Sequence, residues 1–383
     1  MNFLKGKQGL IILVFSQFAG TSLWFAGNVM VAGLAKQGED TSLISFLSSM
    51  VQAGFICGTL VFAILMLPDR IRASRLFFIC SLLAAISNLS IFLNTTDVSF
   101  IALVRFLTGF FIAGIYPVGM KIAAEKFPAD LGNALGFLVG ALVLGTAIPH
   151  LLTGFADWQN VLLTTSFLAV VGGVLVLMFL PSNLPGAKNK FDPSAIITLF
   201  RSRNFRASAF GYFGHMWELY AFWAFVPMII LQFYSLNATE GNPSIFSFLT
   251  IAAGTLGCIA GGLLSKRKGS RQIAFFALLI SGFCCLVLPF SLQSGYLFYP
   301  LMLIWGFTVV ADSPQFSTMV ARSATPEYKG TALTIVTSLG FAITILSIQL
   351  LNRFFELGQY AIWLLLPGPI LGLIATYRYK SLP

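Results

Sequence analysis

The chain has 383 residues, of which 57% are hydrophobic and 9% charged, and its net charge is +10. A soluble domain has about 25% charged residues, so an ordinary water-soluble fold is excluded and a polytopic membrane protein is the class that fits. All five cysteines fall in apolar runs and lack metal-ligand spacing with a histidine. We therefore expect no disulfide, no metal site and no cofactor.

Twelve apolar segments follow one another along the chain, and each can cross a hydrocarbon core, which takes about 20 helical residues. This predicts an all-α integral membrane protein with twelve transmembrane helices. The segments cover residues 9–34, 42–67, 75–94, 98–122, 131–154, 160–180, 207–234, 244–264, 272–292, 295–320, 330–352 and 358–378.

The basic residues are distributed unevenly between the loops. If the N-terminus is cytoplasmic, 20 of the 23 Lys and Arg residues lie in cytoplasmic tails and loops, while Lys36 and Arg353 lie outside and Arg105 lies within a span. This is the positive-inside bias, so both termini are predicted to be cytoplasmic. The positive charge thus orients the chain in a bilayer and requires no nucleic-acid partner.

The chain divides into similar halves. We expect a six-helix bundle at 1–180, a central cytoplasmic loop at 181–206 that ends in a short amphipathic helix, and a second six-helix bundle at 207–383. The pattern P-x-x-x-G-x-A-L occurs at 128–135 and again at 326–333, and Pro117 and Pro314 lie 197 residues apart. Such repeats are typical of secondary transporters, whose substrate site lies between the two repeats near the bilayer midplane.

These features resemble the major facilitator superfamily, and the resemblance covers the whole chain. Asp69 and Arg70 match the D-R pair of the family's second–third loop, although Leu65 and Arg72 replace its glycines, and Arg105 with Gly109 matches R-x-x-x-G in the fourth span. The segments "WELYAFWAF" and "ADSPQFSTMVA" resemble bacterial permeases of the cyanate and nitrate group. The resemblance implies two bundles with pseudo-two-fold symmetry, a cavity lined by spans 1, 4, 7 and 10, and a monomer in a bacterial inner membrane.

Polar and aromatic side chains recur every three or four residues on the spans that this family resemblance assigns to the cavity. We expect these residues to bind the substrate. The same positions could instead hold helices together by hydrogen bonds and packing. The predicted set is Gln17, Trp24, Asn28, Arg105, Tyr116, Phe222, Trp305 and Gln315. Its aromatic character with one cation suits a small organic solute, either anionic or amphipathic. Asp69 and Arg70 are predicted to form a conformational latch.

Titratable groups inside the spans are the strongest functional signal. A charge at the bilayer centre costs about 2.5–3.5 kcal/mol on insertion scales, so Arg105 and Glu218 must face protein or water. A carboxyl group whose surroundings alternate between wet and closed binds a proton in one state and releases it in the other. We therefore predict Glu218 as the main proton-coupling residue, with His215 as its partner and Asp312 as a weaker candidate.

The sequence thus predicts a secondary active transporter, not an enzyme, that moves a small solute by alternating access with proton coupling. Two alternatives stay open: a drug or metabolite efflux antiporter, and a facilitative uniporter in which Glu218 and Arg105 form a structural ion pair. A membrane-embedded enzyme or a channel is less favoured. The chain has no nucleotide-binding G-x-x-x-x-G-K-[ST] motif and no cluster of nucleophiles or metal ligands.

The charge bias generates a first prediction, on topology. Cysteines introduced at Asn189 and Gly241 should react with a membrane-impermeant reagent from opposite sides of the membrane, because the first lies in the cytoplasmic loop and the second outside. Labelling of intact cells and of inverted vesicles tests this. Labelling of both sites in intact cells would overturn the topology.

Overall fold

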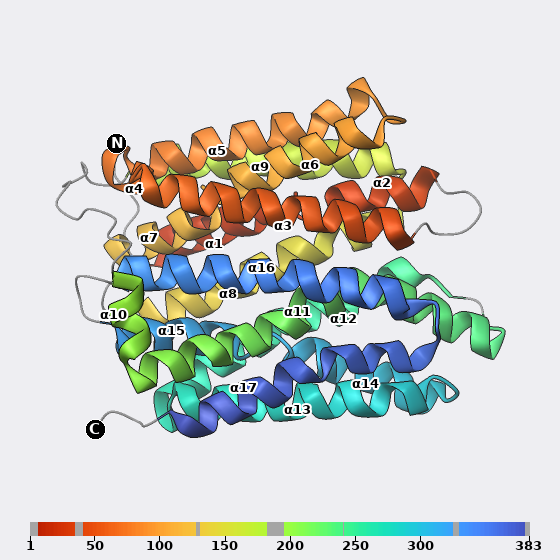
Figure 1. Cartoon of the computed structure of the whole chain (residues 1–383). Helices are drawn as coiled ribbons and strands as arrows, with labels where there is room; N and C mark the ends of the chain where they lie inside the picture. The colour runs from red at the N-terminus through yellow and green to blue at the C-terminus, as the bar shows by residue number, and fades with distance from the viewer. Residues whose placement is uncertain are drawn as a thin grey trace. The chain divides into compact units, whose positions relative to one another are not determined.

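The structure is a computed structural model that describes residues 7–34, 41–127, 131–181, 195–239, 241–324 and 329–379, and in these ranges it contains helices and no strand. Contacts divide the chain into two compact units, Met1–Phe191 and Asp192–Pro383. The first is drawn from red to yellow-green and the second from green to blue in Figure 1. The boundary lies inside the polar stretch 181–206.

In its described residues the first unit contains nine α-helices. They are α1 (Lys7–Thr21), α2 (Ala26–Leu34), α3 (Thr41–Ile64), α4 (Leu67–Arg70), α5 (Ala73–Leu89), α6 (Val98–Ile112), α7 (Tyr116–Lys126), α8 (Leu131–Thr153) and α9 (Trp158–Phe179). A 3₁₀ turn, Ser90–Leu93, extends α5.

The second unit begins, among the described residues, with α10 (Ala195–Arg201), the short helix predicted at the end of the central loop, which lies across the start of α11 (Figure 1). The rest are α11 (Arg203–Asn237), α12 (Pro243–Lys268), α13 (Ser270–Ser291), α14 (Gly295–Thr308), α15 (Ser313–Ser323), α16 (Lys329–Phe355), the 3₁₀ segment Gln359–Leu365 and α17 (Pro367–Arg378).

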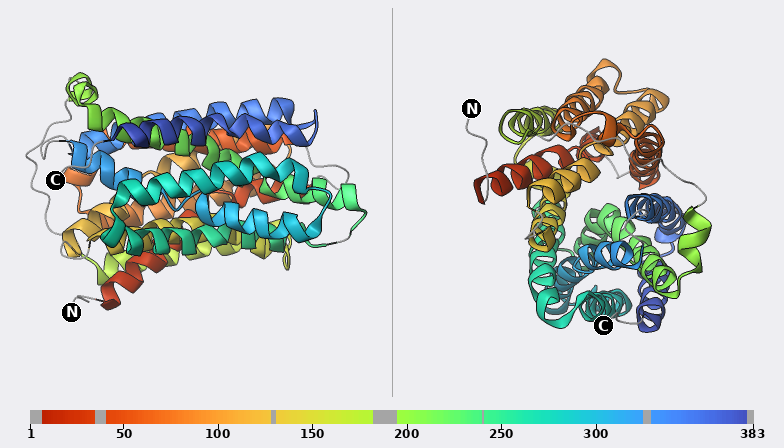
Figure 2. Two further views of the ribbon diagram at one scale, coloured as in Figure 1. Left: turned by 90° about the horizontal axis from the view of Figure 1, so that it is seen from below. Right: turned by 90° about the vertical axis from the view of Figure 1, so that its left-hand side faces the viewer.

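The two units share one pattern of helix pairing. In the first, α1 packs against α8 and α9, α3 against α6, and α5 against α6 and α9. In the second, α11 packs against α16 and α17, α12 against α14, and α13 against α14 and α17. Numbered as spans, these are the same pairs, and the right-hand view of Figure 2 shows many of the helices of each unit close to end-on. The pairing therefore carries the duplication seen in the sequence motifs into the fold.

Glycines allow one of these pairs to approach closely in both units. A Cβ atom on Gly109 of α6 would overlap the carbonyl oxygen of Val51 on α3. A Cβ atom on Gly306 of α14 would likewise overlap the carbonyl oxygen of Thr250 on α12. Small residues that let backbones touch are a common basis of helix packing in membranes, where apolar burial against lipid gives little net gain.

Eleven described helical segments are long and apolar enough to cross a membrane. The remaining predicted span, 9–34, is divided into α1 and α2 by a turn at residues 22–25. Large apolar side chains such as Leu103, Phe167 and Phe283 are more than half exposed, as expected of surfaces that face acyl chains. Together with the helical fold, this indicates an integral membrane protein.

The fourth and tenth spans are also interrupted, which the sequence analysis did not predict. Three residues separate α6 from α7, and four separate α14 from α15. Each interruption is followed by a proline in the first turn of the next helix, Pro117 in α7 and Pro314 in α15. Proline lacks the N–H that would continue the helical ladder and clashes with the preceding turn, so the chain breaks there.

The glycine contacts generate a second prediction. Gly306→Ala should lower the unfolding temperature of the purified protein by several degrees, because overpacking costs about 1–3 kcal/mol and the neighbour here is backbone. Gly295→Ala on the same helix is the matched control, since its Cβ would have no neighbour closer than 3.6 Å. Equal unfolding temperatures for the two variants in a detergent thermal-shift assay would contradict the close approach.

Candidate functional site

Glu218 of α11 is the central polar group of the second unit. Its side chain is buried, with a relative exposure of 1%. Trp305 of α14 donates its indole N–H to Oε1 at 2.7 Å, and the Ser281 hydroxyl of α13 lies 2.9 Å from Oε2. The carboxyl group therefore joins three helices that are distant in sequence.

The two partners of Glu218 differ in what they can do. An indole N–H can only donate, so Oε1 must accept in every state. The hydroxyl of Ser281 can donate to an ionised Oε2 or accept from a protonated one. When it accepts, its own proton can go to the carbonyl of Leu278, 3.3 Å away. The site thus fits Glu218 with or without a proton and needs no change in the position of its neighbours.

His215 and Asp312 form a second polar pair in the same unit. Nδ1 of His215 lies 2.8 Å from Oδ1 of Asp312, and both side chains are buried. Asp312 is the last residue of the break between α14 and α15. The rings of Tyr212 and Phe316 lie against His215, with centroids 5.8 Å and 6.2 Å away. The sequence predicted His215 as the partner of Glu218, whereas the structure places its Nδ1 against Asp312.

Aromatic residues hold the indole that contacts Glu218. Phe222, one turn beyond Glu218 on α11, stacks on Trp305 with ring centroids 4.1 Å apart. Gln315 is buried in the first turn of α15. Within the described part of the chain, no group of three or more His, Cys, Asp or Glu side chains is placed to hold a metal ion.

Arg105 of α6 is the central charge of the first unit and is fully buried. Its guanidinium donates to the carbonyl of Leu23 at 3.3 Å, to the carbonyl of Trp24, and to Oδ1 of Asn88 on α5 at 3.2 Å. Asn88 in turn donates to Oγ of Ser166 on α9 at 3.0 Å. Arg105 therefore binds the carbonyls exposed where α1 gives way to α2.

Gly27 leaves room for the side chain of Arg105, because a Cβ atom at this position would overlap the arginine. The hydrogen bonds found for Arg105 are to residues of the first unit, and those of Glu218 are to residues of the second. Each group is therefore stabilised within its own unit and does not depend on the other for its hydrogen bonds.

Three amide side chains of the first unit carry polar atoms with no hydrogen-bond partner among the described residues. Both amide atoms of Gln17 and of Gln52 are in this state, as is Oδ1 of Asn28, whose Nδ2 donates to Ser48 at 2.7 Å. A buried polar atom without a partner costs about 1–3 kcal/mol. Such atoms are candidates for contact with a solute or with water.

The other predicted positions of the first unit differ in burial, from the buried Trp24 to the exposed Arg70. Trp24 lies in the turn between α1 and α2, and its ring lies against Phe55, with centroids 5.1 Å apart. Tyr116, the first residue of α7, is half-buried. Arg70 is exposed at the end of α4, while the side chain of Asp69 lies outside the described residues. The latch formed by Asp69 and Arg70 stays a prediction.

Ser281 is not among the residues predicted from the sequence, because it lies in the ninth span and the family resemblance assigns spans 1, 4, 7 and 10 to the cavity. A lone serine in an apolar helix usually donates to its own backbone, so its residue type carries no signal. Asn88 of the third span was not predicted either, and only the structure connects it to Arg105.

Comparison with known proteins decides the family. The family model of the Major Facilitator Superfamily matches residues 66–348. The chain belongs to the major facilitator superfamily. This family and fold are those of transporters and not of enzymes.

Two relatives illustrate the range. The putative multidrug resistance protein MdtD of Escherichia coli O6:H1 is 26% identical over 243 residues, which cover 61% of this chain and 49% of that protein. The chain thus spans about half the length of MdtD. The uncharacterized MFS-type transporter C09D4.1 of Caenorhabditis elegans is 24% identical over 196 residues, 48% of this chain and 33% of that protein.

A solved structure shares the fold. The crystal structure of the human organic anion transporter MFSD10 (TETRAN) matches with a TM-score of 0.72 and covers 97% of this chain and 99% of that chain. Sequence identity between the two is 16%. This likeness concerns the fold alone.

The carbonyl contacts of Arg105 generate a third prediction. Arg105→Lys keeps the charge but loses the planar set of donors, so it cannot reach Leu23, Trp24 and Asn88 together. Each lost hydrogen bond to a charged group costs about 1.5–3 kcal/mol, and the substrate-free protein should unfold several degrees lower. Arg75→Lys, at an exposed position of α5, should leave the unfolding temperature unchanged. If Arg105→Lys unfolds at the wild-type temperature, these hydrogen bonds do not stabilise the fold.

Proposed function

We propose that this transporter is a proton-coupled carrier that moves a small organic solute by alternating access. Glu218 is the proton-binding residue. The observation that carries the proposal is its buried carboxyl group, held by one donor that is fixed and one hydroxyl that can reverse its hydrogen bond. His215 and Asp312 form a second titratable pair on the same helix and at the start of α15.

The proton cycle follows from these contacts. With Glu218 neutral, the proton on Oε2 is donated to Ser281, and the site carries no net charge from this residue. When water reaches the site, the proton leaves to water and Ser281 reverses to donate to the carboxylate. The ionised form is costly without that water, since a charge in the bilayer costs about 2.5–3.5 kcal/mol. Hydration of the site and loss of the proton are therefore linked, as coupled transport requires.

The solute is proposed to be anionic or amphipathic. The unpartnered amides of Gln17, Asn28 and Gln52 offer hydrogen bonds, and Trp24 and Tyr116 offer flat apolar contact. The names of similar proteins agree with this class, because MdtD is a putative multidrug resistance protein and the structural neighbour MFSD10 is an organic anion transporter.

Efflux by antiport is the variant that the name of MdtD favours. In that variant an entering proton drives export of a drug or metabolite. A facilitative uniporter with an ion pair between Glu218 and Arg105 is less well supported, because each of these groups is hydrogen-bonded within its own unit.

Glu218→Gln provides the fourth prediction and tests coupling. Glutamine keeps the shape and can still accept from Trp305, but it cannot exchange a proton. Reconstituted in vesicles, the variant should lose pH-gradient-driven accumulation of a compound first selected by thermal shift from small organic anions and amphipathic amines. It should retain binding and counterflow of that compound.

Glu356→Gln removes an exposed carboxyl group of the same unit and is the matched control, expected to transport as the wild type does. Accumulation by Glu218→Gln at the wild-type level would show that another residue couples the proton. Loss of binding as well would assign Glu218 to the solute site or the scaffold.

A further inference from the structure

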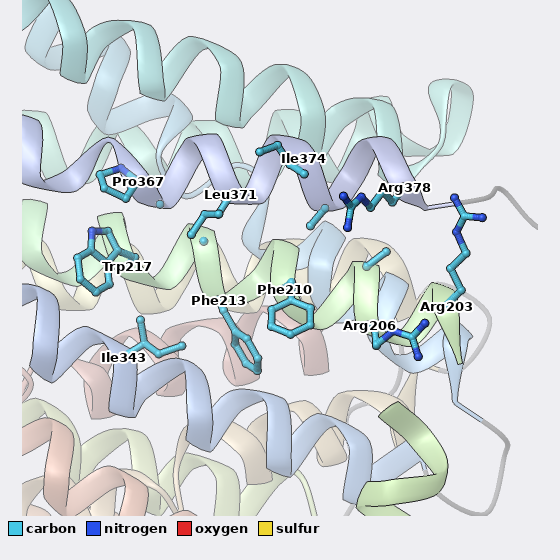
Figure 3. A pocket seen from close by; sticks show the side chains of 14 residues that line it. Arg203, Arg206, Phe210, Phe213, Trp217, Ile343, Pro367, Leu371, Ile374 and Arg378 are labelled. Carbon is cyan, nitrogen blue, oxygen red and sulfur yellow. The ribbon is translucent and has the colours of Figure 1, made fainter. Parts of the chain in front are cut away.

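A deep groove lies on the second unit, between α11, α16 and α17 (Figure 3). Its volume is about 810 Å³, and its walls are almost wholly apolar. Phe210 and Phe213 of α11 and Leu371 of α17 project into it. The groove reaches inward because α11 and α17 touch backbone to backbone where Gly214 meets Gly368. Bulkier side chains then stand apart on either side of this contact.

Arginines gather at one end of the groove and an aromatic residue closes the other. Figure 3 shows Arg203, Arg206 and Arg378 together at one end and Trp217 toward the opposite end. Arg203 begins α11 and Arg378 ends α17, so the two helix ends bring both charges to the same level. Among the described residues, those that line the groove include no acidic one.

Two of these arginines are available for a ligand. Arg206 donates to the carbonyls of Phe200 and Arg201 at 2.7 Å and 2.9 Å, which fastens α10 to α11. The side chains of Arg203 and Arg378, by contrast, have no hydrogen-bond partner among the residues that the structure describes, and both are exposed. Each presents a planar guanidinium group, which can bind phosphate oxygens through two parallel hydrogen bonds.

A second apolar groove meets the first at these arginines. Its volume is about 640 Å³, and Arg203, Ile374 and Arg378 line both grooves. From there it extends along the other side of α17, past Tyr377 to Phe275 of α13. The shared arginines therefore lie where the two apolar grooves meet.

The length of the first groove matches one leaflet. Trp217 follows Arg206 by eleven positions, which at 1.5 Å per residue is about 16.5 Å along the helix. Half of a hydrocarbon core of about 30 Å is about 15 Å. An acyl chain that starts at the level of Arg206, about one turn beyond Arg203, would thus cross about one leaflet by the level of Trp217.

We propose that this site binds one anionic phospholipid of the cytoplasmic leaflet. Its phosphate lies between Arg203 and Arg378, one acyl chain follows the groove between α11, α16 and α17, and the other follows the groove toward α13. Two apolar grooves that meet at a cationic end fit an anionic lipid with two acyl chains better than a solute with one chain. Charge near the leaflet surface adds to the affinity for anionic lipids.

The test compares lipids on the full-length protein in a neutral detergent, by native mass spectrometry and thermal shift. Phosphatidylglycerol should bind at least tenfold more tightly than phosphatidylcholine with the same chains. The double variant Arg203→Gln/Arg378→Gln should abolish this preference. Arg267→Gln/Lys268→Gln, which removes the same charge from the exposed end of α12, should keep it within twofold. Ile374→Trp leaves the charges but narrows both grooves, and should weaken phosphatidylglycerol several-fold.

Three outcomes would overturn the proposal. Equal binding of the two lipids would show that charge does not select the lipid. Equal loss of the phosphatidylglycerol preference in the two double variants would show that Arg203 and Arg378 are not the specific contacts. Stabilisation by glycerol 3-phosphate to the level reached with phosphatidylglycerol would assign the arginines to a free phosphate and leave the grooves without a function. If Arg203→Gln/Arg378→Gln unfolds without lipid, the Ile374→Trp result decides.

Discussion

The need to satisfy polar groups inside a helical unit governs this structure more than any other constraint. In a bilayer there is no water to receive an unpaired N–H, carbonyl or charge, so leaving such a group without a partner in the protein is costly. The guanidinium of Arg105 donates to the carbonyls of Leu23 and Trp24, which lie where the helix is interrupted at residues 22–25. The broken helix and the buried cation thus explain each other: each would be costly alone.

The same reasoning accounts for the repeated architecture. Both units place a glycine of the fourth or tenth span against backbone of the second or eighth, and both break that span just before a proline. The break in the second unit places Asp312 at the start of α15, where its carboxyl group meets His215. A feature that began as a proline repeat in the sequence therefore determines where an acidic side chain can lie.

Much of the fold could be predicted from the sequence, because hydropathy identifies helices of the length that crosses a bilayer. The spans and the family follow from hydropathy, charge and short motifs. The sequence paired His215 with Glu218, whereas the structure places His215 against Asp312 and Trp305 against Glu218. The interruptions at 22–25, 113–115 and 309–312 could not be read, since apolar composition is the same in a helix and in a buried turn. Ser281 and the carbonyl contacts of Arg105 were out of reach as well. A serine among apolar residues has many possible partners, and a carbonyl acceptor has no residue type to reveal it.

The two buried ionisable groups, Arg105 and Glu218, differ in their ability to exchange a proton, and we therefore expect different roles for them. Arg105 donates to two main-chain carbonyls and to the amide oxygen of Asn88. A guanidinium does not release its proton under ordinary conditions. Such a group can fix helices and set a constant positive potential, but it cannot carry a proton through a cycle. Glu218 has the opposite properties, because its partner Ser281 accepts as readily as it donates. The interior of the second unit can therefore change its charge while its hydrogen bonds persist, whereas the known contacts of the first unit hold a charge in place. In the proposed proton-coupled cycle, Glu218 is the group that changes its charge and Arg105 is the group that keeps it.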